Sequence, residues 1–159
     1  MNKTRTLDAE AAALLERARA STIPPYESVT PAKAREYNAM GRQHVQPAKP
    51  DMSLIQDLDA GGITLRHYRP LGVPAYLVLP ALVYFHGGGW VLGDLDSHDV
   101  VARTLCNVSG GAVFSVNYRV APEARFPAAV DDAFAATRWI AANAAALKCD
   151  PARLAVGGD

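Results

Sequence analysis

The residues best suited to chemistry lie in one glycine-rich segment, His86-Gly87-Gly88-Gly89-Trp90, which follows the apolar run 81–85. Such a run is typical of a buried strand. Inside a helix or strand each glycine would cost about 0.5–1 kcal/mol relative to alanine, so three in a row favour a turn with unusual backbone angles. A turn of this kind at a strand end exposes backbone N–H groups, which can hold the oxyanion of an acyl-transfer reaction. On these glycines alone, a plain tight turn is an equally good interpretation.

Phosphate is the other anion that glycine-rich turns commonly bind. The known phosphate loops follow the patterns Gly-x-x-x-x-Gly-Lys-Ser/Thr or Gly-x-Gly-x-x-Gly. Neither pattern occurs around 86–93, and Asp94 places an acidic side chain next to the turn. The sequence therefore favours an oxyanion over a phosphate.

The remaining reactive side chains show weaker patterns. Ser109 precedes two glycines, but it lacks the earlier glycine of a nucleophile turn, so a helix end is expected there. His86 is expected to shape the glycine loop through hydrogen bonds, and His98 to lie on the surface or cap a helix. Cys106 and Cys149 have no metal-ligand spacing, so no metal site is expected. They are interpreted as buried thiols in a reducing compartment, which predicts a cytoplasmic location.

The elements that must position this segment differ on the two sides of residue 50. Before it, two helical patterns cover residues 7–20, with Asp8 as the cap, and about 31–45. Prolines separate the two patterns and end the second one. Residues 1–50 are therefore predicted to form a helical appendage outside the sheet.

Past residue 51, short apolar strands alternate with helices. This order predicts an α/β fold with a mostly parallel sheet, helices on both faces and an antiparallel N-terminal hairpin. Strands are expected at 54–58, 63–68, 82–85, 112–116 and 153–156, with one helix ending at Gly110 and another over 127–147. The apolar stripes of these helices are expected to be Val100, Val101, Leu105 and Val108 in the first, and Val130, Phe134, Thr137 and Ile140 in the second.

The composition excludes several classes of protein. Half of the 159 residues are hydrophobic, and 16 basic residues balance 16 acidic ones. This balance favours a folded domain over disorder and argues against a nucleic-acid binder. No apolar run reaches the ~18 residues that span a bilayer, and the acidic residues soon after Met1 argue against a signal peptide. No nucleic-acid or membrane partner is therefore expected.

Three segments, in matching order and spacing, resemble one enzyme family. They are 84–93 around the glycines, 117–132 with its Tyr-Arg-Val-Ala-Pro-Glu block, and 150–159 leading to Gly158-Asp159. Together they resemble the hormone-sensitive-lipase-like (bacterial family IV type) branch of the α/β-hydrolase carboxylesterases. The resemblance implies the α/β-hydrolase fold, a cap formed by residues 1–50, a core that begins with 51–159, and no cofactor.

The resemblance also implies roles for individual residues. Gly88 and Gly89 are expected to donate the oxyanion hydrogen bonds, with His86 and Gly87 supporting the loop. Asp159 is expected to brace the nucleophile turn. The substrate-binding residues implied are Trp90 and Tyr26, and Arg119 and Glu123 are expected to form a supporting polar network or a surface salt bridge.

The family's nucleophile turn continues Gly-Asp-Ser-Ala-Gly-Gly, and Gly158-Asp159 match its first two residues. The resemblance thus implies that the serine, the triad acid and the base belong to a missing C-terminal half, and that this chain alone is inactive. Truncation and a chemically modified serine both remain open as reasons for the chain's end. The whole protein is expected to be a serine carboxylesterase for small, short-acyl esters. A non-catalytic small-molecule receptor of the same fold is the alternative, and a homodimer stays open.

Overall fold

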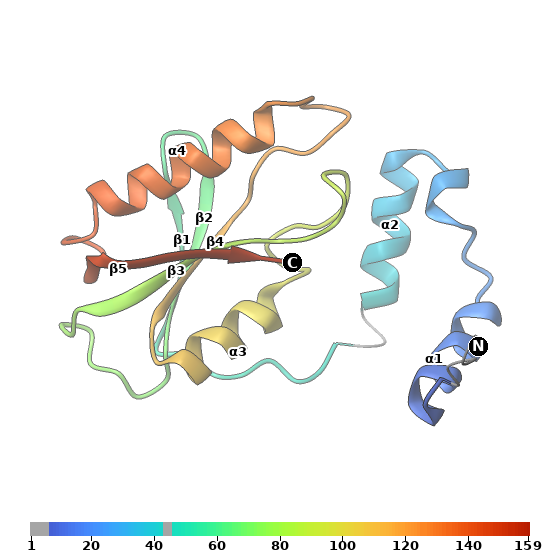
Figure 1. Cartoon of the computed structure of the whole chain (residues 1–159), viewed down its shortest axis with the longest axis horizontal. Coiled ribbons are helices and arrows are strands. Elements are labelled where there is room, and N and C mark those ends of the chain that lie inside the picture. The colour runs from blue at the N-terminus through green and yellow to red at the C-terminus, as the bar shows by residue number, and fades with distance from the viewer. Residues whose placement is uncertain (1–6, 43–45) are drawn as a thin grey trace, which may run out of the picture.

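The computed structural model describes residues 7–42 and 46–159 and has a five-stranded sheet at its centre (Figure 1). The strand order is β1-β2-β4-β3-β5. The strands are β1 (Leu54–Asp59), β2 (Thr64–Arg69), β3 (Leu79–Phe85), β4 (Ala112–Val116) and β5 (Cys149–Gly158). The helices are α1 (Ala9–Arg19), the 3₁₀ turn η1 (Tyr26–Ser28), α2 (Pro31–Arg42), α3 (Asp99–Ser109) and α4 (Ala128–Ala142).

The sheet has the predicted mixed topology. β1 and β2 form an antiparallel hairpin, and its turn is closed by a 2.7 Å hydrogen bond from Gly62 N–H to Asp59 Oδ1. β2 also pairs antiparallel with β4, whereas β3 runs parallel to both β4 and β5. The α/β prediction and the hairpin are therefore confirmed. The parallel pairs bring the carboxyl ends of β3, β4 and β5 to one edge of the sheet.

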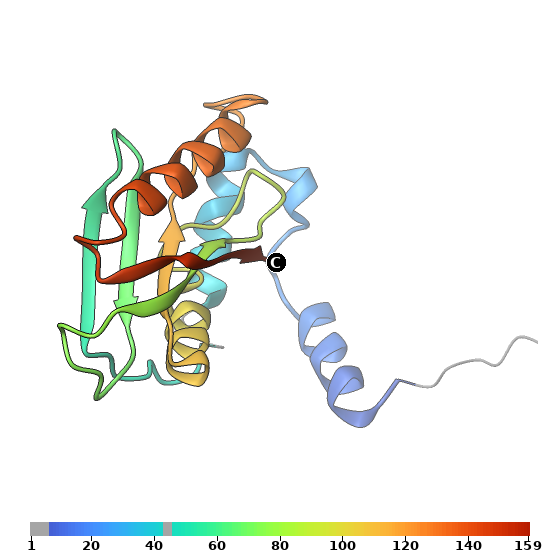
Figure 2. The same ribbon diagram turned by 60° about the vertical axis from the view of Figure 1, so that its left-hand side comes forward.

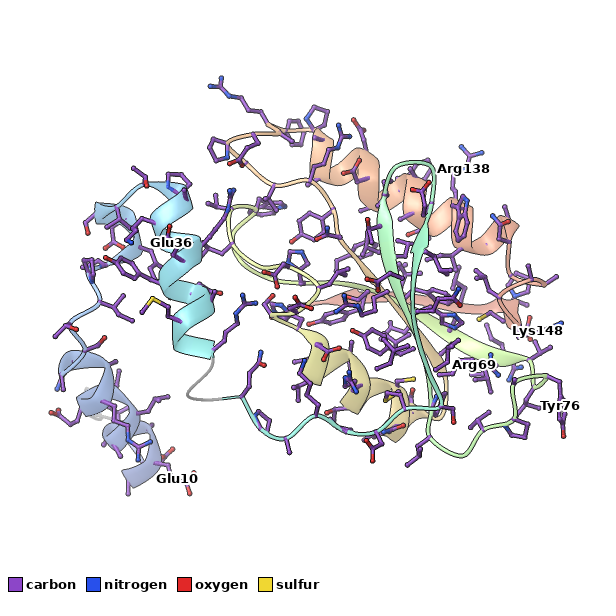
Figure 3. All side chains as sticks on the ribbon, turned by 180° about the vertical axis from the view of Figure 1, so that it is seen from behind. Glu10, Glu36, Arg69, Tyr76, Arg138 and Lys148 are labelled. Atoms are coloured by element: carbon purple, nitrogen blue, oxygen red, sulfur yellow. The ribbon has the colours of Figure 1, made fainter. Side chains whose placement is uncertain are left out.

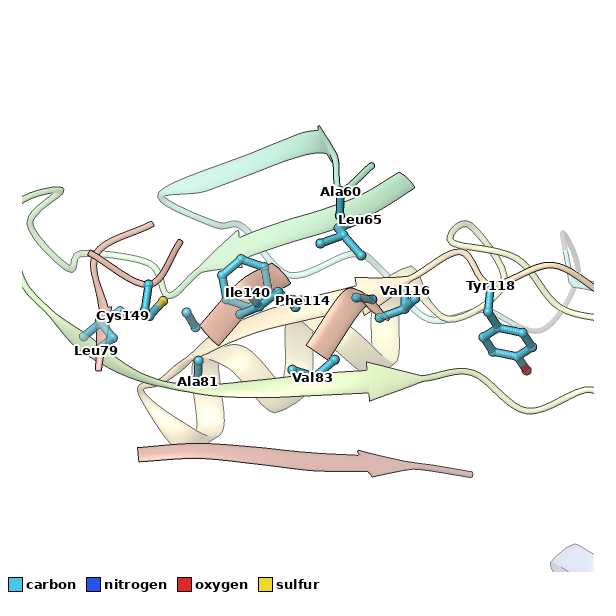
Figure 4. Close-up of a cluster of buried hydrophobic side chains, with 13 residues drawn as sticks. Ala60, Leu65, Leu79, Ala81, Val83, Phe114, Val116, Tyr118, Ile140 and Cys149 are labelled. Atoms are coloured by element: carbon cyan, nitrogen blue, oxygen red, sulfur yellow. The ribbon is translucent and has the colours of Figure 1, made fainter. Parts of the chain in front are cut away.

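Helices cover both faces of the sheet, with α4 on one side and α3 on the other (Figure 1). On the α4 side the core is built on Leu65, Val83, Phe114 and Ile140, all fully buried (Figure 4). On the α3 side a smaller cluster contains Tyr68, Tyr84, Ala102, Cys106 and Val113. The two clusters alternate along the strands because successive strand side chains point to opposite faces.

The predicted apolar stripes of α3 and α4 are wrong in part. Ala102 and Cys106 are the buried apolar residues of α3, and none of the four residues of its predicted stripe is buried, with Val108 84% exposed. In α4, Ile140 is buried as predicted, but Phe134 is 65% exposed and Ala136 takes its place inside. Ala102, Cys106 and Ala136 are small, which lets both helices lie close to the sheet at these positions.

The N-terminal helices lie beside the sheet and outside it. Asp8 caps α1 as predicted, by accepting a 2.8 Å hydrogen bond from Ala11 N–H. None of the residues of α1 is buried, and the helix stands away from the sheet (Figure 2). α2 begins at Pro31 as predicted and extends to Arg42; residues 43–45 of the predicted helix lie outside the described residues.

At the opposite end of the sheet, Arg69 fixes the loop that precedes β3. Its guanidinium donates to the carbonyl oxygens of Pro74, Leu77 and Lys148 over 2.7–3.3 Å. Arg69 and Lys148 therefore meet at the start of β5, far from the carboxyl edge (Figure 3). Among residues 7–42 and 46–159, no helix has both the length and the apolar content needed to cross a membrane.

Candidate functional site

A pocket of about 520 Å³ opens at the carboxyl edge of the sheet, where β3 and β5 end. Its walls are the loop 85–90, the end of β5 at 156–159, Tyr118, and three residues of α4, namely Ala129, Val130 and Ala133. Ligands of α/β sheets commonly bind beyond the carboxyl ends of the strands. The glycine segment singled out from the sequence thus forms a wall of this pocket.

The glycine loop has a backbone that other residues would not adopt. Gly88 has φ +131°, and a Cβ there would lie 2.2 Å from the Leu92 carbonyl oxygen. The Gly88 carbonyl oxygen accepts from the N–H groups of Val91 and Leu92, at 3.2 and 2.8 Å, which closes the turn. Gly89 has φ +61°, and Trp90, although not a glycine, has φ +60°. The loop therefore has a fixed shape that depends on glycine at position 88.

Two amides of this loop are free to bind a ligand. Within residues 7–42 and 46–159, no hydrogen-bond acceptor is found for the N–H of Gly88 or of Gly89. Both glycines are exposed and both line the pocket. Adjacent free N–H groups in a rigid loop are the arrangement that stabilises an oxyanion in acyl transfer.

His86 is buried behind the loop. Its Nδ1 lies 3.0 Å from the Gly87 carbonyl oxygen, and the Tyr118 hydroxyl donates to the His86 carbonyl oxygen. The His86 and Tyr118 rings stack with centroids 4.3 Å apart. Burial lowers the pKa of His86, which favours the neutral imidazole. These contacts fit the loop-shaping role expected of His86.

Asp159 lies beside the glycine loop and accepts hydrogen bonds from two other elements. Its Oδ1 accepts from the Tyr84 hydroxyl at 2.7 Å and from Gly87 N–H at 2.9 Å, and its Oδ2 lies 3.2 Å from His98 Nε2. The Tyr84 hydrogen bond is the main reason why the pKa of Asp159 is lowered. The carboxylate therefore stays charged and ties the end of β5 to the loop.

His98 is the site residue that the sequence did not reveal. We expected it on the surface or as a helix cap. It does occupy the N-cap position of α3, but its side chain makes no capping hydrogen bond. Its imidazole instead contacts Asp159 through Nε2 and Ser97 Oγ through Nδ1, the latter at 2.7 Å. No sequence signal predicts this pair, because it depends on β5 pairing with β3.

A second set of contacts anchors the loop to α2 and to the segment after β4. Ala121 N–H donates to the Trp90 carbonyl oxygen at 2.7 Å. Arg35 of α2 donates to the carbonyl oxygens of Val91 and Ala121 and forms an ion pair with Glu123. This ion pair lowers the pKa of Glu123 to about 2.

The predicted network between Arg119 and Glu123 is therefore not formed. Arg119 pairs with the buried Asp132 instead, at 2.7 Å, and Glu123 pairs with Arg35. The residues were correctly expected to be in polar contacts, but each has a partner from another element.

The two expected substrate-binding residues lie in different places. Trp90 lines the pocket and is 67% exposed. Tyr26 lies in η1 and does not line the pocket, so its role remains a prediction. Cys106 and Cys149 are free, buried thiols. Over the described ranges 7–42 and 46–159, no cluster of three His, Cys, Asp or Glu side chains could hold a metal ion.

Comparison with known proteins gives a consistent result. Residues 82–159 match a family model described as the alpha/beta hydrolase fold. The chain is 45% identical over 118 residues to the esterase LipI of Mycobacterium tuberculosis. The matched region covers 74% of this chain and 37% of LipI. It is 47% identical over 109 residues to an ethyl acetate hydrolase of Pseudomonas putida, covering 69% of this chain and 34% of that protein.

Solved structures agree with these relatives. A thermostable esterase from Pseudomonas putida ECU1011 superimposes with a TM-score of 0.88 at 32% identity, covering 99% of this chain and 50% of that chain. The hyperthermophilic esterase from the archaeon Pyrobaculum calidifontis gives 0.86 at 37% identity, covering 98% and 50%. The chain thus spans about a third of the length of the curated relatives and half of the solved structures.

Proposed function

This chain belongs to the α/β-hydrolase fold family, and from that premise we propose that the whole protein is a serine carboxylesterase for small, short-acyl esters. The observation that carries the proposal is the pair of N–H groups at Gly88 and Gly89 on the wall of the pocket, for which residues 7–42 and 46–159 provide no hydrogen-bond acceptor. Several relatives are named esterases or ester hydrolases, which supports ester hydrolysis as the reaction.

Gly88 and Gly89 are proposed to hold the oxyanion of the tetrahedral intermediate. Each such donor contributes about 2.7–4 kcal/mol to transition-state stabilisation. His86 and Gly87 support the loop from behind, and Trp90 contacts the substrate. The side chains along α4 and the end of β5 that line the pocket are mostly small and apolar, which fits a short acyl chain.

The nucleophile is proposed to be a serine in a segment that continues from β5. Asp159 holds the end of β5 against the glycine loop, so we propose that the carbonyl oxygen of an ester attacked by this serine lies beside the amides of Gly88 and Gly89. A histidine base and an acid from the same segment would complete the triad, with an acyl-enzyme as the intermediate. On this proposal residues 7–159 by themselves supply the oxyanion loop but no turnover.

The outer edge of β5 in the described sheet supports the proposal that the fold continues beyond it. β5 pairs with β3 on one side only, and its Val156 is 63% exposed. An unpaired apolar edge is normally covered in native proteins. We propose that residues 51–159 form the first half of the α/β-hydrolase core, and that the remaining strands of the sheet pair with the free edge of β5.

Residues 1–50 are proposed to act as the cap of the pocket. The support is the bidentate contact of Arg35 with Glu123, together with its hydrogen bonds to the Val91 and Ala121 carbonyl oxygens, because these place α2 beside the glycine loop. Tyr26, in η1 just before α2, is the residue proposed to reach the substrate when the cap closes.

The test is hydrolysis of p-nitrophenyl acetate, butyrate and decanoate by the whole protein. We expect turnover of acetate and butyrate and a much lower kcat/KM for decanoate. Absence of turnover, combined with measurable binding of the same esters, would favour a small-molecule receptor of this fold instead. A preference for decanoate would overturn the short-acyl part of the proposal.

A further inference from the structure

We propose that His98 is a positioning residue: by holding Asp159, it keeps the Gly87–Gly89 loop in its oxyanion-binding shape. The proposal rests on the proposed ester hydrolysis for its kinetic consequences, but its structural part can be tested without any activity. His98 does not line the pocket, so it acts through Asp159 and not on the substrate.

The Asp159 carboxylate must keep one orientation to accept the hydrogen bond from Gly87 N–H. Tyr84 and Gly87 both bond Oδ1, and the only side chain of the described residues that bonds Oδ2 is His98. Without His98 the carboxylate can rotate about its bond to Cβ and weaken the Gly87 hydrogen bond.

The hydrogen between His98 and Asp159 lies on His98 Nε2. A carboxylate only accepts hydrogen bonds, and Asp159 is charged because its pKa is lowered. Nε2 must therefore carry the hydrogen that lies between them. The imidazole ring is 17% exposed and its Nδ1 contacts Ser97 Oγ at 2.7 Å, so both ring nitrogens have fixed partners.

Polar contacts also connect His98 to α2 in the N-terminal region. Ser97 Oγ accepts from Asp94 N–H at 2.8 Å, and Asp94 accepts from Arg42 of α2 at 2.8 Å. A continuous chain of polar contacts therefore joins Arg42 to Asp159. Because hydrogen bonds in a network can strengthen one another, this chain of contacts can fix the imidazole more firmly than Asp159 alone could.

The contact between His98 and Asp159 acts on the oxyanion loop through Gly87. Gly87 N–H donates to Asp159 at 2.9 Å, and a Cβ at Gly87 would lie 2.9 Å from Asp159 Oδ2, so carboxylate and backbone are in close contact. The next two amides are those of Gly88 and Gly89. A displacement of the Gly87 peptide therefore moves the two proposed oxyanion donors with it.

The experiment compares His98→Gln with His98→Asn in the whole protein. The glutamine amide nitrogen reaches the position of Nε2 and can donate to Asp159, whereas the asparagine amide reaches the position of Nδ1 and cannot. We expect His98→Asn to lower kcat by roughly tenfold or more with little change in KM. His98→Gln should keep kcat close to the parent value.

The second readout is the Gly87 amide resonance in glycine-labelled protein. We expect it to move upfield in His98→Asn and to stay in place in His98→Gln, while Gly61 and Gly62 of the β1–β2 turn stay in place in both and report correct folding. An unchanged Gly87 resonance in folded His98→Asn, or equal kcat values in the two variants, would overturn the proposal. If the parent protein hydrolyses no ester, the proposed function fails, while the Gly87 comparison still tests the role of His98.

Discussion

The Tyr84 hydroxyl donates a 2.7 Å hydrogen bond to Asp159 Oδ1 and so joins the carboxyl ends of β3 and β5. Tyr84 is 4% exposed and packs in the cluster on the α3 side of the sheet. The buried core thereby fixes the Asp159 carboxylate. The position of the glycine loop depends on this contact as well as on His98.

Replacement Tyr84→Phe should shift the acid titration of the Asp159 carboxylate. The Tyr84 hydrogen bond stabilises the charged form of Asp159 and lowers its pKa, so its loss raises that pKa. Asp159 then becomes protonated at a higher pH, and its side-chain carboxyl ¹³C resonance should titrate at a higher pH than in the parent protein. Tyr76→Phe is the matched control, because Tyr76 is 79% exposed at the opposite end of the sheet (Figure 3). Identical titration of Asp159 in the two variants would contradict the role of Tyr84.

Replacement Gly88→Ala should disable the loop, whereas Gly89→Ala should not. An alanine Cβ at position 88 would overlap the Leu92 carbonyl oxygen at 2.2 Å, but at position 89 nothing lies within 4 Å. We expect kcat to fall by roughly 10²–10³ in Gly88→Ala, as for loss of an oxyanion donor. Gly89→Ala keeps its N–H and should lose only about 1 kcal/mol of stability through its positive φ. Equal kcat values would show that the shape of this loop does not matter.

The attachment of α2 should depend on Arg35 more than on the charge of Glu123. Arg35 bonds two backbone carbonyl oxygens in addition to Glu123. Arg35→Met removes all of these contacts and should make the segment around Ile23 to Tyr26 more sensitive to limited proteolysis. Glu123→Gln removes only an exposed ion pair, which contributes little to stability, and should leave the cleavage rate nearly unchanged. Equal cleavage rates in both variants and the parent would argue that α2 is not held by Arg35.

The sequence allowed the order of elements and the location of the loop to be predicted, because these depend on local patterns. Gly110 does end α3 with φ +66°, and Asp8 does cap α1. The inward faces of the helices were harder to predict, since apolar periodicity does not reveal how closely a helix approaches the sheet. Val108 and Phe134 satisfy the helical period and are nevertheless exposed.

The polar contacts of the site could not be predicted for a different reason. The partners of Asp159 come from β3, the glycine loop and the start of α3, and they meet only after β5 inserts beside β3. Likewise, Arg119 and Glu123 lie close in the sequence but pair with Asp132 and Arg35. Contacts of this kind follow from topology, and residue spacing does not encode them.

Stability should decrease in mildly acidic solution through His67. Its ring is buried and stacks on Phe114 with centroids 4.3 Å apart, and burial lowers its pKa to about 4. Between about pH 6.5 and this value, the unfolded chain binds a proton that the folded protein does not. The free energy of unfolding therefore falls as the pH is lowered through this window, by up to about 3 kcal/mol.

The variant His67→Phe should lose much of this dependence. Phenylalanine does not titrate and can stack on Phe114, and the His67 Nε2 that it removes has no hydrogen-bond partner among the described residues. Chemical denaturation of the whole protein at pH 7 and pH 4.5 measures the difference, and His86, whose pKa burial also lowers, should account for a remaining slope. An unchanged difference between the two pH values would assign the acid sensitivity to other groups.

A crystal structure of the whole protein can test whether the Gly88 and Gly89 amides bind an oxyanion. The protein is first reacted with a p-nitrophenyl alkylphosphonate. The phosphonyl oxygen of the adduct imitates the oxyanion of the tetrahedral intermediate. We expect this oxygen at about 2.7–3.1 Å from both the Gly88 and Gly89 nitrogen atoms. A covalent adduct whose phosphonyl oxygen is bonded elsewhere, with both glycine amides still unpaired, would contradict it.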